Sequence, residues 1–201
     1  MIKTIIFDWG GVLIDNPADE FINFCAQEIG TTPKLLEPII NTHLQEFQIG
    51  TISEKEFWKL ICTELKITPP NNPSLWKKAV KSFFTEKPEV FQIVKSLNTL
   101  GYQVGFLSNT EKPTQKHFFE MNYNKIFESP TFSCEAGVAK PDAKIFTLTL
   151  NNLNATPETT VFIDDKPEFT SAAATLNINT ITFNSPKQLK TELQNLGIKL
   201  L

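Results

Sequence analysis

Four positions in this sequence carry residues that can bind or react with a phosphoryl group. Three of them directly follow short apolar runs, and the fourth is a lysine that precedes a proline. They are Asp8, Ser108, Lys140 and the pair Asp164-Asp165. A carboxylate can act as a nucleophile, a hydroxyl or an ammonium group can bind an anion, and paired carboxylates can bind a metal ion. These residue types point to metal-assisted chemistry on an anionic substrate.

The Asp164-Asp165 pair is the most specific of these features. Two adjacent carboxylates at a strand end repel each other unless a cation lies beside them. Mg²⁺, a hard divalent ion that prefers oxygen ligands, is the natural occupant of such a position. A plain helix or turn cap requires one aspartate and not two, so the pair favours a metal site.

The remaining positions have both a functional and a structural interpretation. Asp8 ends an apolar run, and Gly10 and Gly11 allow a tight turn close to a ligand, but an aspartate can also cap a turn. In Ser108-Asn109, the hydroxyl could bind a phosphate oxygen together with backbone N–H groups, although a simple turn has the same sequence. Lys140 could neutralise a phosphate or a carboxylate, or could be a solvated lysine before a helix cap.

The apolar runs alternate with helical patterns in most of the chain. The runs cover Thr4–Phe7, Gln103–Leu107, Thr160–Ile163 and Thr180–Phe183, and the helical patterns cover Pro88–Leu100, Pro113–Met121, Asp142–Asn152, Pro167–Leu176 and Pro186–Leu196. Short apolar strands separated by helices predict an α/β fold with a doubly wound parallel sheet. Polar residues at the carboxyl ends of such strands would meet at one edge of the sheet.

Residues 16–88 show helical periodicity only. Ser53 and Glu56 have the spacing of a capping box, which predicts a helix start. We therefore expect a core domain of residues 1–15 and 89–201, interrupted by an all-helical domain of residues 16–88. Trp58 and Trp76 are interpreted as part of the core of that helical domain.

Composition limits the possible partners and location. The chain has 201 residues, a net charge of −3 and three widely spaced cysteines. The charge argues against a nucleic-acid partner or an anionic membrane surface. Reduced, buried thiols and the absence of a signal-like or membrane-spanning segment predict a cytoplasmic protein, either monomeric or homodimeric.

The order Asp, Ser, Lys and Asp-Asp resembles the four motifs of the haloacid dehalogenase superfamily over essentially the whole chain. The run from Glu135 to Phe146 is particularly similar to the third motif. The helical insertion resembles the cap of the subfamily that includes small sugar-phosphate phosphatases and haloacid dehalogenases, and Gly50 to Trp58 resembles a recurrent cap segment. The resemblance implies a Rossmann-like core and a small phosphorylated metabolite as substrate.

The resemblance also implies roles for individual residues. Asp8 would attack phosphorus and form an aspartyl-phosphate that water then hydrolyses. Ser108 and Lys140 would hold the phosphoryl group, and Gly10, Gly11 and Asn109 would also lie against the substrate. Mg²⁺ would be held by Asp8, the backbone carbonyl of Gly10, Asp164 and Asp165.

Gly10 departs from the family pattern. Phosphatases of this family usually have an aspartate two residues after the nucleophile, where it protonates the leaving oxygen and later activates water. Some sugar-phosphate phosphatases have glycine there, so another proton source could serve. Alternatively, the chain binds phosphate with little turnover, or it is a dehalogenase. Dehalogenases of the family need no leaving-group acid, but they lack the paired acidic motif that this chain has at Asp164-Asp165.

Overall fold

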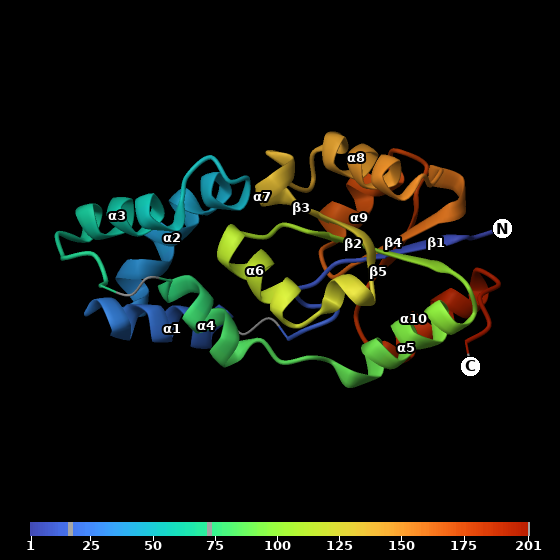
Figure 1. The fold of residues 1–201 in the computed structure, drawn as a ribbon, viewed down its shortest axis with the longest axis horizontal. Coiled ribbons are helices and arrows are strands. Elements are labelled where there is room, and N and C mark those ends of the chain that lie inside the picture. Colours follow the sequence, from blue (N-terminus) through green and yellow to red (C-terminus); the bar gives the residue numbers. More distant parts are fainter. Residues whose placement is uncertain (16–17, 72–73, 201) are drawn as a thin grey trace.

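A computed structural model of the chain describes residues 1–15, 18–71 and 74–200. A five-stranded parallel sheet lies at its centre, with strand order β3-β2-β1-β4-β5 (Figure 1). The strands are β1 (Thr4–Phe7), β2 (Gln103–Ser108), β3 (Glu128–Phe132), β4 (Thr160–Asp164) and β5 (Asn179–Thr182). The helices are α1 (Ala18–Ile29), α2 (Pro33–Gln48), α3 (Glu54–Leu65), α4 (Leu75–Phe83), α5 (Pro88–Thr99), α6 (Lys112–Glu120), α7 (Ser133–Ala136), α8 (Ala143–Leu153), α9 (Pro167–Ala174) and α10 (Pro186–Asn195), with short 3-10 helices at Tyr123–Lys125 and Pro157–Thr159. The predicted α/β fold with a parallel sheet is confirmed.

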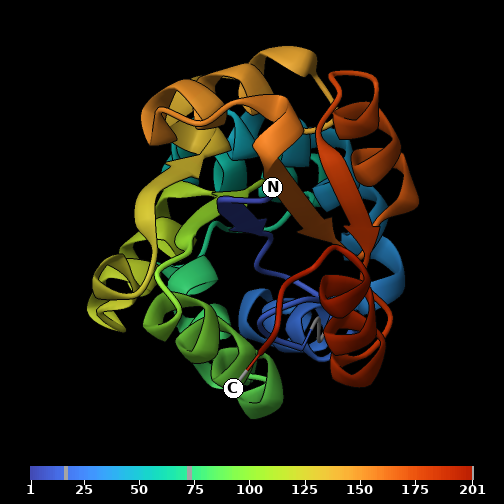
Figure 2. The same cartoon turned by 90° about the vertical axis from the view of Figure 1, so that its right-hand side faces the viewer.

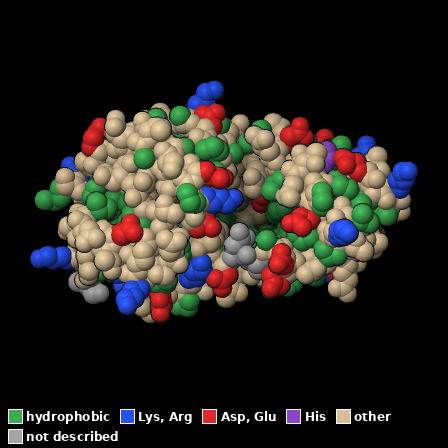
Figure 3. All heavy atoms as spheres, turned by 180° about the vertical axis from the view of Figure 1, so that it is seen from behind, with side chains coloured by type: hydrophobic (Ala, Val, Ile, Leu, Met, Phe, Trp, Pro, Cys, Tyr) green, Lys and Arg blue, Asp and Glu red, His purple; other side chains and the backbone are tan. Residues whose placement is uncertain are grey.

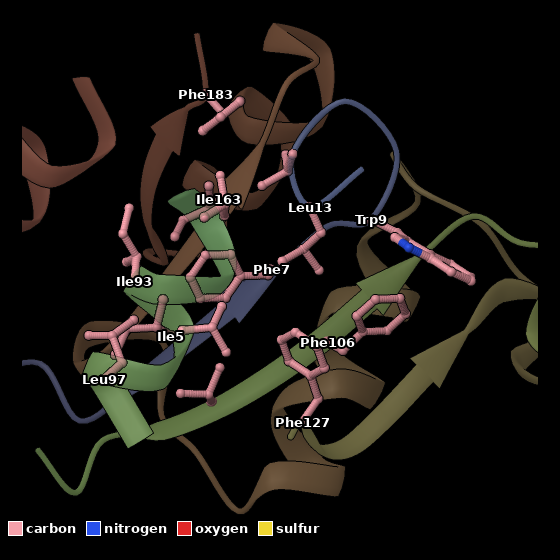
Figure 4. Packing of buried hydrophobic residues seen from close by; sticks show 14 of the residues in the cluster. Ile5, Phe7, Trp9, Leu13, Ile93, Leu97, Phe106, Phe127, Ile163 and Phe183 are labelled. Atoms are coloured by element: carbon pink, nitrogen blue, oxygen red, sulfur yellow. The ribbon is translucent and has the colours of Figure 1, made fainter. Parts of the chain in front are cut away.

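The central strand β1 is buried on both faces. Ile5 and Phe7 point to one side of the sheet, where they pack with α5 and α10, whereas Ile6 points to the other side, toward α8 and α9. Figure 2 shows these helix pairs on opposite sides of the sheet, and Figure 4 shows the packing around Phe7. The apolar runs read from the sequence thus form strands that are covered by helices on both faces.

The edge strand β3 was not expected from the sequence. It is short, contains Pro130, and begins with the exposed residues Glu128 and Ser129. Proline is tolerated at a sheet edge because one side of the strand needs no ladder hydrogen bonds. Its sequence therefore lacks the continuous apolar run that marks the central strands.

Helices α1 to α4 form the insertion between β1 and α5, and we call residues 18–83 the helical insertion (Figure 1). It has its own buried cluster, in which Trp58 and Trp76 pack with phenylalanines. The capping box of Ser53 and Glu56 at the start of α3 is confirmed. The chain leaves and re-enters the core side by side, since the Asp15 N–H donates to the Thr85 carbonyl at 2.9 Å.

The helical insertion contacts the core on two sides. On one side Lys77 and Lys81 of α4 form ion pairs with Glu120 of α6. On the other side the turn after α2 packs against α7, and the Ser133 hydroxyl donates to the Gln48 carbonyl at 2.7 Å. Gly50, with a φ of +75°, lies so close to the Cys134 carbonyl that a Cβ at this position would clash with it.

Gly50 and Gly30 offer a matched pair for testing this contact. Both have a φ of +75°, but a Cβ at Gly30 would meet no heavy atom within 4 Å. Gly30→Ala should lower the free energy of unfolding by about 1–2 kcal/mol, because alanine is strained in this backbone region. Gly50→Ala should lower it further, because its methyl group also clashes with the α7 backbone. Urea unfolding checks this order, and equal losses would contradict the close contact.

Candidate active site

The sequence-predicted site residues meet at the carboxyl edge of the sheet. β1 lies between β2 and β4, and Phe7 is in register with Ile163, so Asp8 and Asp164 leave adjacent strand ends. Ser108 ends β2 on the other side of β1. Lys140 comes from the loop between α7 and α8. A parallel sheet places these ends together because all its strands run in one direction.

Lys140 occupies the centre of the site. Its ammonium group is buried and lies 2.7 Å from Oδ1 of Asp8 and 2.6 Å from Oδ2 of Asp164. Burial acts to lower the pKa of Lys140, but the two carboxylates more than offset it, so the pKa is raised and the ammonium group stays charged. Burial also raises the pKa of Asp8, Lys140 opposes this effect, and Asp164 adds to it.

The side chain of Asn109 fixes the backbone of Lys140. Its Nδ2 donates to the Lys140 carbonyl at 2.9 Å, and its Oδ1 accepts from the Lys140 N–H at 2.8 Å. The rings of Phe162 and Phe169 lie 5.4 and 5.0 Å from the Lys140 ammonium group. Asn109 thus borders the cavity, but its amide is already committed to hydrogen bonds with the Lys140 backbone.

Three carboxylates form a possible metal site. Asp8, Asp164 and Asp165 each offer an oxygen, and these oxygens all lie within 4.8 Å of one another. Three negative charges and the positive charge of Lys140 leave a net charge of −2, which one divalent cation would neutralise. Burial and the neighbouring Asp164 raise the pKa of Asp165, and Lys166 and Lys140 oppose this shift. The oxygen donors and their charge fit Mg²⁺.

Gly10 and Gly11 differ in their surroundings. A Cβ at Gly11, which has a φ of +79°, would collide with the carboxylate of Asp165, so glycine at this position lets the Asp165 side chain approach the loop. A Cβ at Gly10 would meet nothing within 4 Å. Gly10 borders a cavity of about 770 Å³, whereas Gly11 does not line it. Of the two glycines predicted to face the substrate, Gly10 thus lies at the cavity and Gly11 lies against Asp165.

This cavity lies between the sheet edge and the helical insertion. Asp8, Ser108, Lys140 and Asp165 line it from the core side, and α1, α2 and α4 contribute the opposite wall. The Ser108 hydroxyl is buried and accepts a hydrogen bond from Thr110 Oγ1 at 2.6 Å. Figure 3 shows the hollow between the core and the helical insertion. The volume suffices for an organic phosphate, not only for inorganic phosphate.

Glu111 is a buried residue in the cavity wall that the sequence did not indicate. Its carboxylate accepts hydrogen bonds from Gln48 Nε2 at 3.0 Å, Trp76 Nε1 at 3.1 Å and Thr114 Oγ1 at 3.0 Å. Burial raises the pKa of Glu111, and these hydrogen bonds oppose that shift. Since Gln48 and Trp76 belong to the helical insertion, Glu111 connects it to the core. An acidic residue before α6 resembles an ordinary helix start, so this role could not be predicted from the local sequence.

The family model for haloacid dehalogenase-like hydrolases matches residues 2–176. The chain belongs to this family. A haloacid dehalogenase family enzyme from Bacteroides thetaiotaomicron, solved in complex with magnesium and inorganic phosphate, is similar in structure to this hydrolase. The TM-score is 0.78 at 25% sequence identity, and the match covers 92% of this chain and 95% of that one.

Three relatives of this hydrolase have names that describe their activity or family. A D-ribitol-5-phosphate phosphatase from Bacteroides thetaiotaomicron is 26% identical over 82% of this chain and 84% of its own length. A sesquiterpene phosphatase from Aspergillus oryzae is 24% identical over 85% of this chain and 84% of its own length. Acyl-CoA dehydrogenase family member 10 of the mouse is 26% identical over 96% of this chain, but the hydrolase spans only 19% of that protein.

Replacing Lys140 should reveal how strongly it stabilises the two carboxylates. Lys140→Met leaves Asp8 and Asp164 buried without their cation, a change that typically costs about 3–5 kcal/mol. The loss should be larger at pH 8 than at pH 5. Without the ammonium group the folded-state pKa of Asp8 rises further, so protonation relieves the repulsion at low pH and the stability is lost as pH rises.

Chemical unfolding of the metal-free protein at both pH values measures this loss. Lys144→Met, at an exposed position on α8, is the control and should change stability by less than about 0.5 kcal/mol. A Lys140→Met protein as stable as wild type at pH 8 would show that the ammonium group does not hold the carboxylates together.

Proposed function

We propose that this hydrolase is a magnesium-dependent phosphatase that acts on a small phosphorylated metabolite. The observation that carries the proposal is the arrangement of Asp8, Lys140 and Asp164, with Asp165 beside them, at the floor of a cavity large enough for an organic phosphate. A carboxylate nucleophile, a fixed cation and a set of oxygen donors are what phosphoryl transfer requires.

In the first step a carboxylate oxygen of Asp8 forms a bond to phosphorus. The bond between phosphorus and the ester oxygen breaks, and the ester oxygen leaves with the electron pair and takes up a proton. Ser108 and Lys140 bind the phosphoryl oxygens and hold phosphorus in line with Asp8. The charge of Lys140 also favours the carboxylate form of Asp8 that can attack, and so opposes the effect of burial on the pKa of Asp8.

In the second step water attacks the phosphorus of the aspartyl-phosphate, and phosphate is released as the Asp8 carboxylate is restored. Asp8, Asp164, Asp165 and the backbone carbonyl of Gly10 would hold Mg²⁺. When bound, the ion supplies charge neutralisation for the transferring phosphoryl group.

Glu111 lines the same cavity, but its carboxylate accepts hydrogen bonds from Gln48, Trp76 and Thr114, so we assign it to the junction with the helical insertion and not to proton transfer.

The names of the relatives support phosphatase chemistry, and the magnesium and phosphate in the solved Bacteroides enzyme support the same site. A phosphate-binding protein with little turnover is the alternative, because Gly10 supplies no acid. Dehalogenase chemistry is the weaker alternative, since the carboxylate cluster fits a metal that this chemistry does not need.

The other proposals concern organisation and location. We propose that residues 16–88 act as a cap domain over a core of residues 1–15 and 89–201; residues 16–17 and 72–73 of that range lie outside the described residues. No described helix combines the length and hydropathy that a membrane crossing would require. A cytoplasmic location and a monomeric or homodimeric state remain predictions from the sequence.

Two substitutions test the proposed function directly. Asp8→Asn should abolish Mg²⁺-dependent hydrolysis of phosphate esters, because the amide keeps the shape but cannot attack phosphorus. Asp165→Asn should weaken the rise in Tm that millimolar Mg²⁺ causes in wild type by binding the folded state. Phosphate release and thermal unfolding are the measurements. If Asp8→Asn is as active as wild type, the proposed mechanism is wrong. If Mg²⁺ does not change the Tm of wild type, the proposed metal site is wrong.

The glycine at position 10 predicts a strong dependence on the leaving group. Aryl phosphates, whose oxygen needs little protonation, should turn over faster than alkyl phosphates at saturation. Gly10→Asp should raise the kcat for alkyl phosphates, because general acid catalysis is worth roughly 10²–10⁴-fold. A Cβ at this position meets no heavy atom within 4 Å, and Gly10 borders the cavity into which the side chain could extend.

Gly10→Asn is the matched control, because it has the same shape but no acidic proton. Only Gly10→Asp should accelerate alkyl ester hydrolysis. If wild type hydrolyses alkyl phosphates efficiently and neither variant is faster, another group supplies the proton and the glycine at position 10 does not limit the rate.

A further inference from the structure

The charges around the cavity restrict the charge that the leaving group of the substrate can carry. Among the described residues, the cations that line the cavity are Lys140 and Lys166, and both belong to the core. The helical insertion contributes Glu37 to the lining and no lysine. Its lysines at positions 77, 78 and 81 form ion pairs with Glu120 or Glu28 instead.

The whole sequence contains no arginine, since all 19 basic residues are lysines. Forked, bidentate recognition of a second phosphate or a carboxylate is therefore impossible anywhere in this chain. A leaving group with its own negative charge would face Glu37 and would find no cation on the wall of the helical insertion. Against this wall, on the side opposite the core residue Lys166, desolvating such a charge without a partner is costly, so the wall of the helical insertion disfavours bisphosphates and phosphorylated acids.

The inner part of the same wall is apolar. Phe21 and Ile22 of α1, Ile40 and Leu44 of α2, Trp76 of α4, and Phe84 line the cavity there. Phe21, Ile40 and Trp76 are buried, and the other three are half-buried. Three polar side chains of α2 in the lining, Glu37, Asn41 and Gln45, are exposed and lie toward solvent. The fourth, Gln48, is half-buried and donates a hydrogen bond to Glu111.

We propose that the substrate is a phosphate monoester of an uncharged alcohol whose carbon skeleton is mainly hydrocarbon. The phosphate lies at Asp8 and Lys140, and the hydrocarbon part lies against the apolar inner wall, where its transfer from water is favourable. Any hydroxyl groups face the polar mouth formed by α2. The inference rests on the proposed phosphatase function and names its substrate class. It favours an apolar alcohol over a polyol as the leaving group.

Two five-carbon esters provide a matched test, since pentyl phosphate and ribitol 5-phosphate differ only in the hydroxyl groups of the chain. Their Kd values are measured by calorimetry on the Asp8→Asn protein with saturating Mg²⁺, so that binding is separated from chemistry. Pentyl phosphate should bind at least about tenfold more tightly, because the apolar side chains offer no partners for four hydroxyls and the Glu111 carboxylate beside them is already hydrogen-bonded to Gln48, Trp76 and Thr114. Glycerol 3-phosphate should likewise bind at least about tenfold more tightly than 3-phosphoglycerate.

Two leucines on α2 provide the control for the wall. Leu44 lines the cavity, whereas Leu35 is 57% exposed and does not line it. In the Asp8→Asn background, Leu44→Asn should reduce the preference for pentyl phosphate at least about threefold, and Leu35→Asn should leave it unchanged. An equal effect of both substitutions would overturn the assignment of the wall.

Hydrolysis of the same esters by wild type separates this inference from the proposed function. Turnover of ribitol 5-phosphate, together with equal or tighter binding of that ester, would overturn the inference and leave the phosphatase function intact. Tighter binding of 3-phosphoglycerate would also overturn it. Preferential binding of pentyl phosphate without hydrolysis of any ester would support the ligand class and contradict the phosphatase function.

Discussion

The buried ammonium group of Lys140 between Asp8 and Asp164 is the interaction on which this site depends. Two carboxylates at adjacent strand ends can remain ionised in a buried position only if a cation lies between them. Lys140 supplies that cation from a distant loop, and Asn109 fixes the lysine backbone with two hydrogen bonds. The remaining charge of −2 leaves the site complementary to a divalent ion.

The two sides of the cavity, one from the core and one from the helical insertion, differ in chemical character. The core supplies Lys140 and the carboxylates that we propose act on a phosphoryl group, and the helical insertion supplies an apolar wall with a polar mouth. Glu111 connects the two sides through Gln48 and Trp76, so the position of the wall depends on a buried carboxylate of the core. In the proposed function, substrate choice and phosphoryl chemistry would therefore depend on different segments of the chain.

The two glycines after Asp8 serve opposite physical purposes. Gly11 has a positive φ and is crowded by Asp165, so its lack of a side chain is a steric requirement of the carboxylate cluster. Gly10 has open space around it, so its lack of a side chain is not forced by packing. What is missing at Gly10 is a functional group, and this makes the source of the leaving-group proton the central chemical question for the hydrolase.

The sequence by itself determined the parallel sheet, the helical nature of the insertion and the identity of the strand-end residues, because strand burial, helix capping and residue type are local properties. It did not reveal β3, whose Pro130 and exposed start hide an edge strand. Nor did it distinguish Gly10 from Gly11, reveal that Asn109 is committed to Lys140, or identify Glu111 as the link to Gln48 and Trp76. The contacts of Gly11 and Asn109 arise between core residues that are distant along the chain, and those of Glu111 arise where the helical insertion packs on the core, so only the tertiary structure decided them.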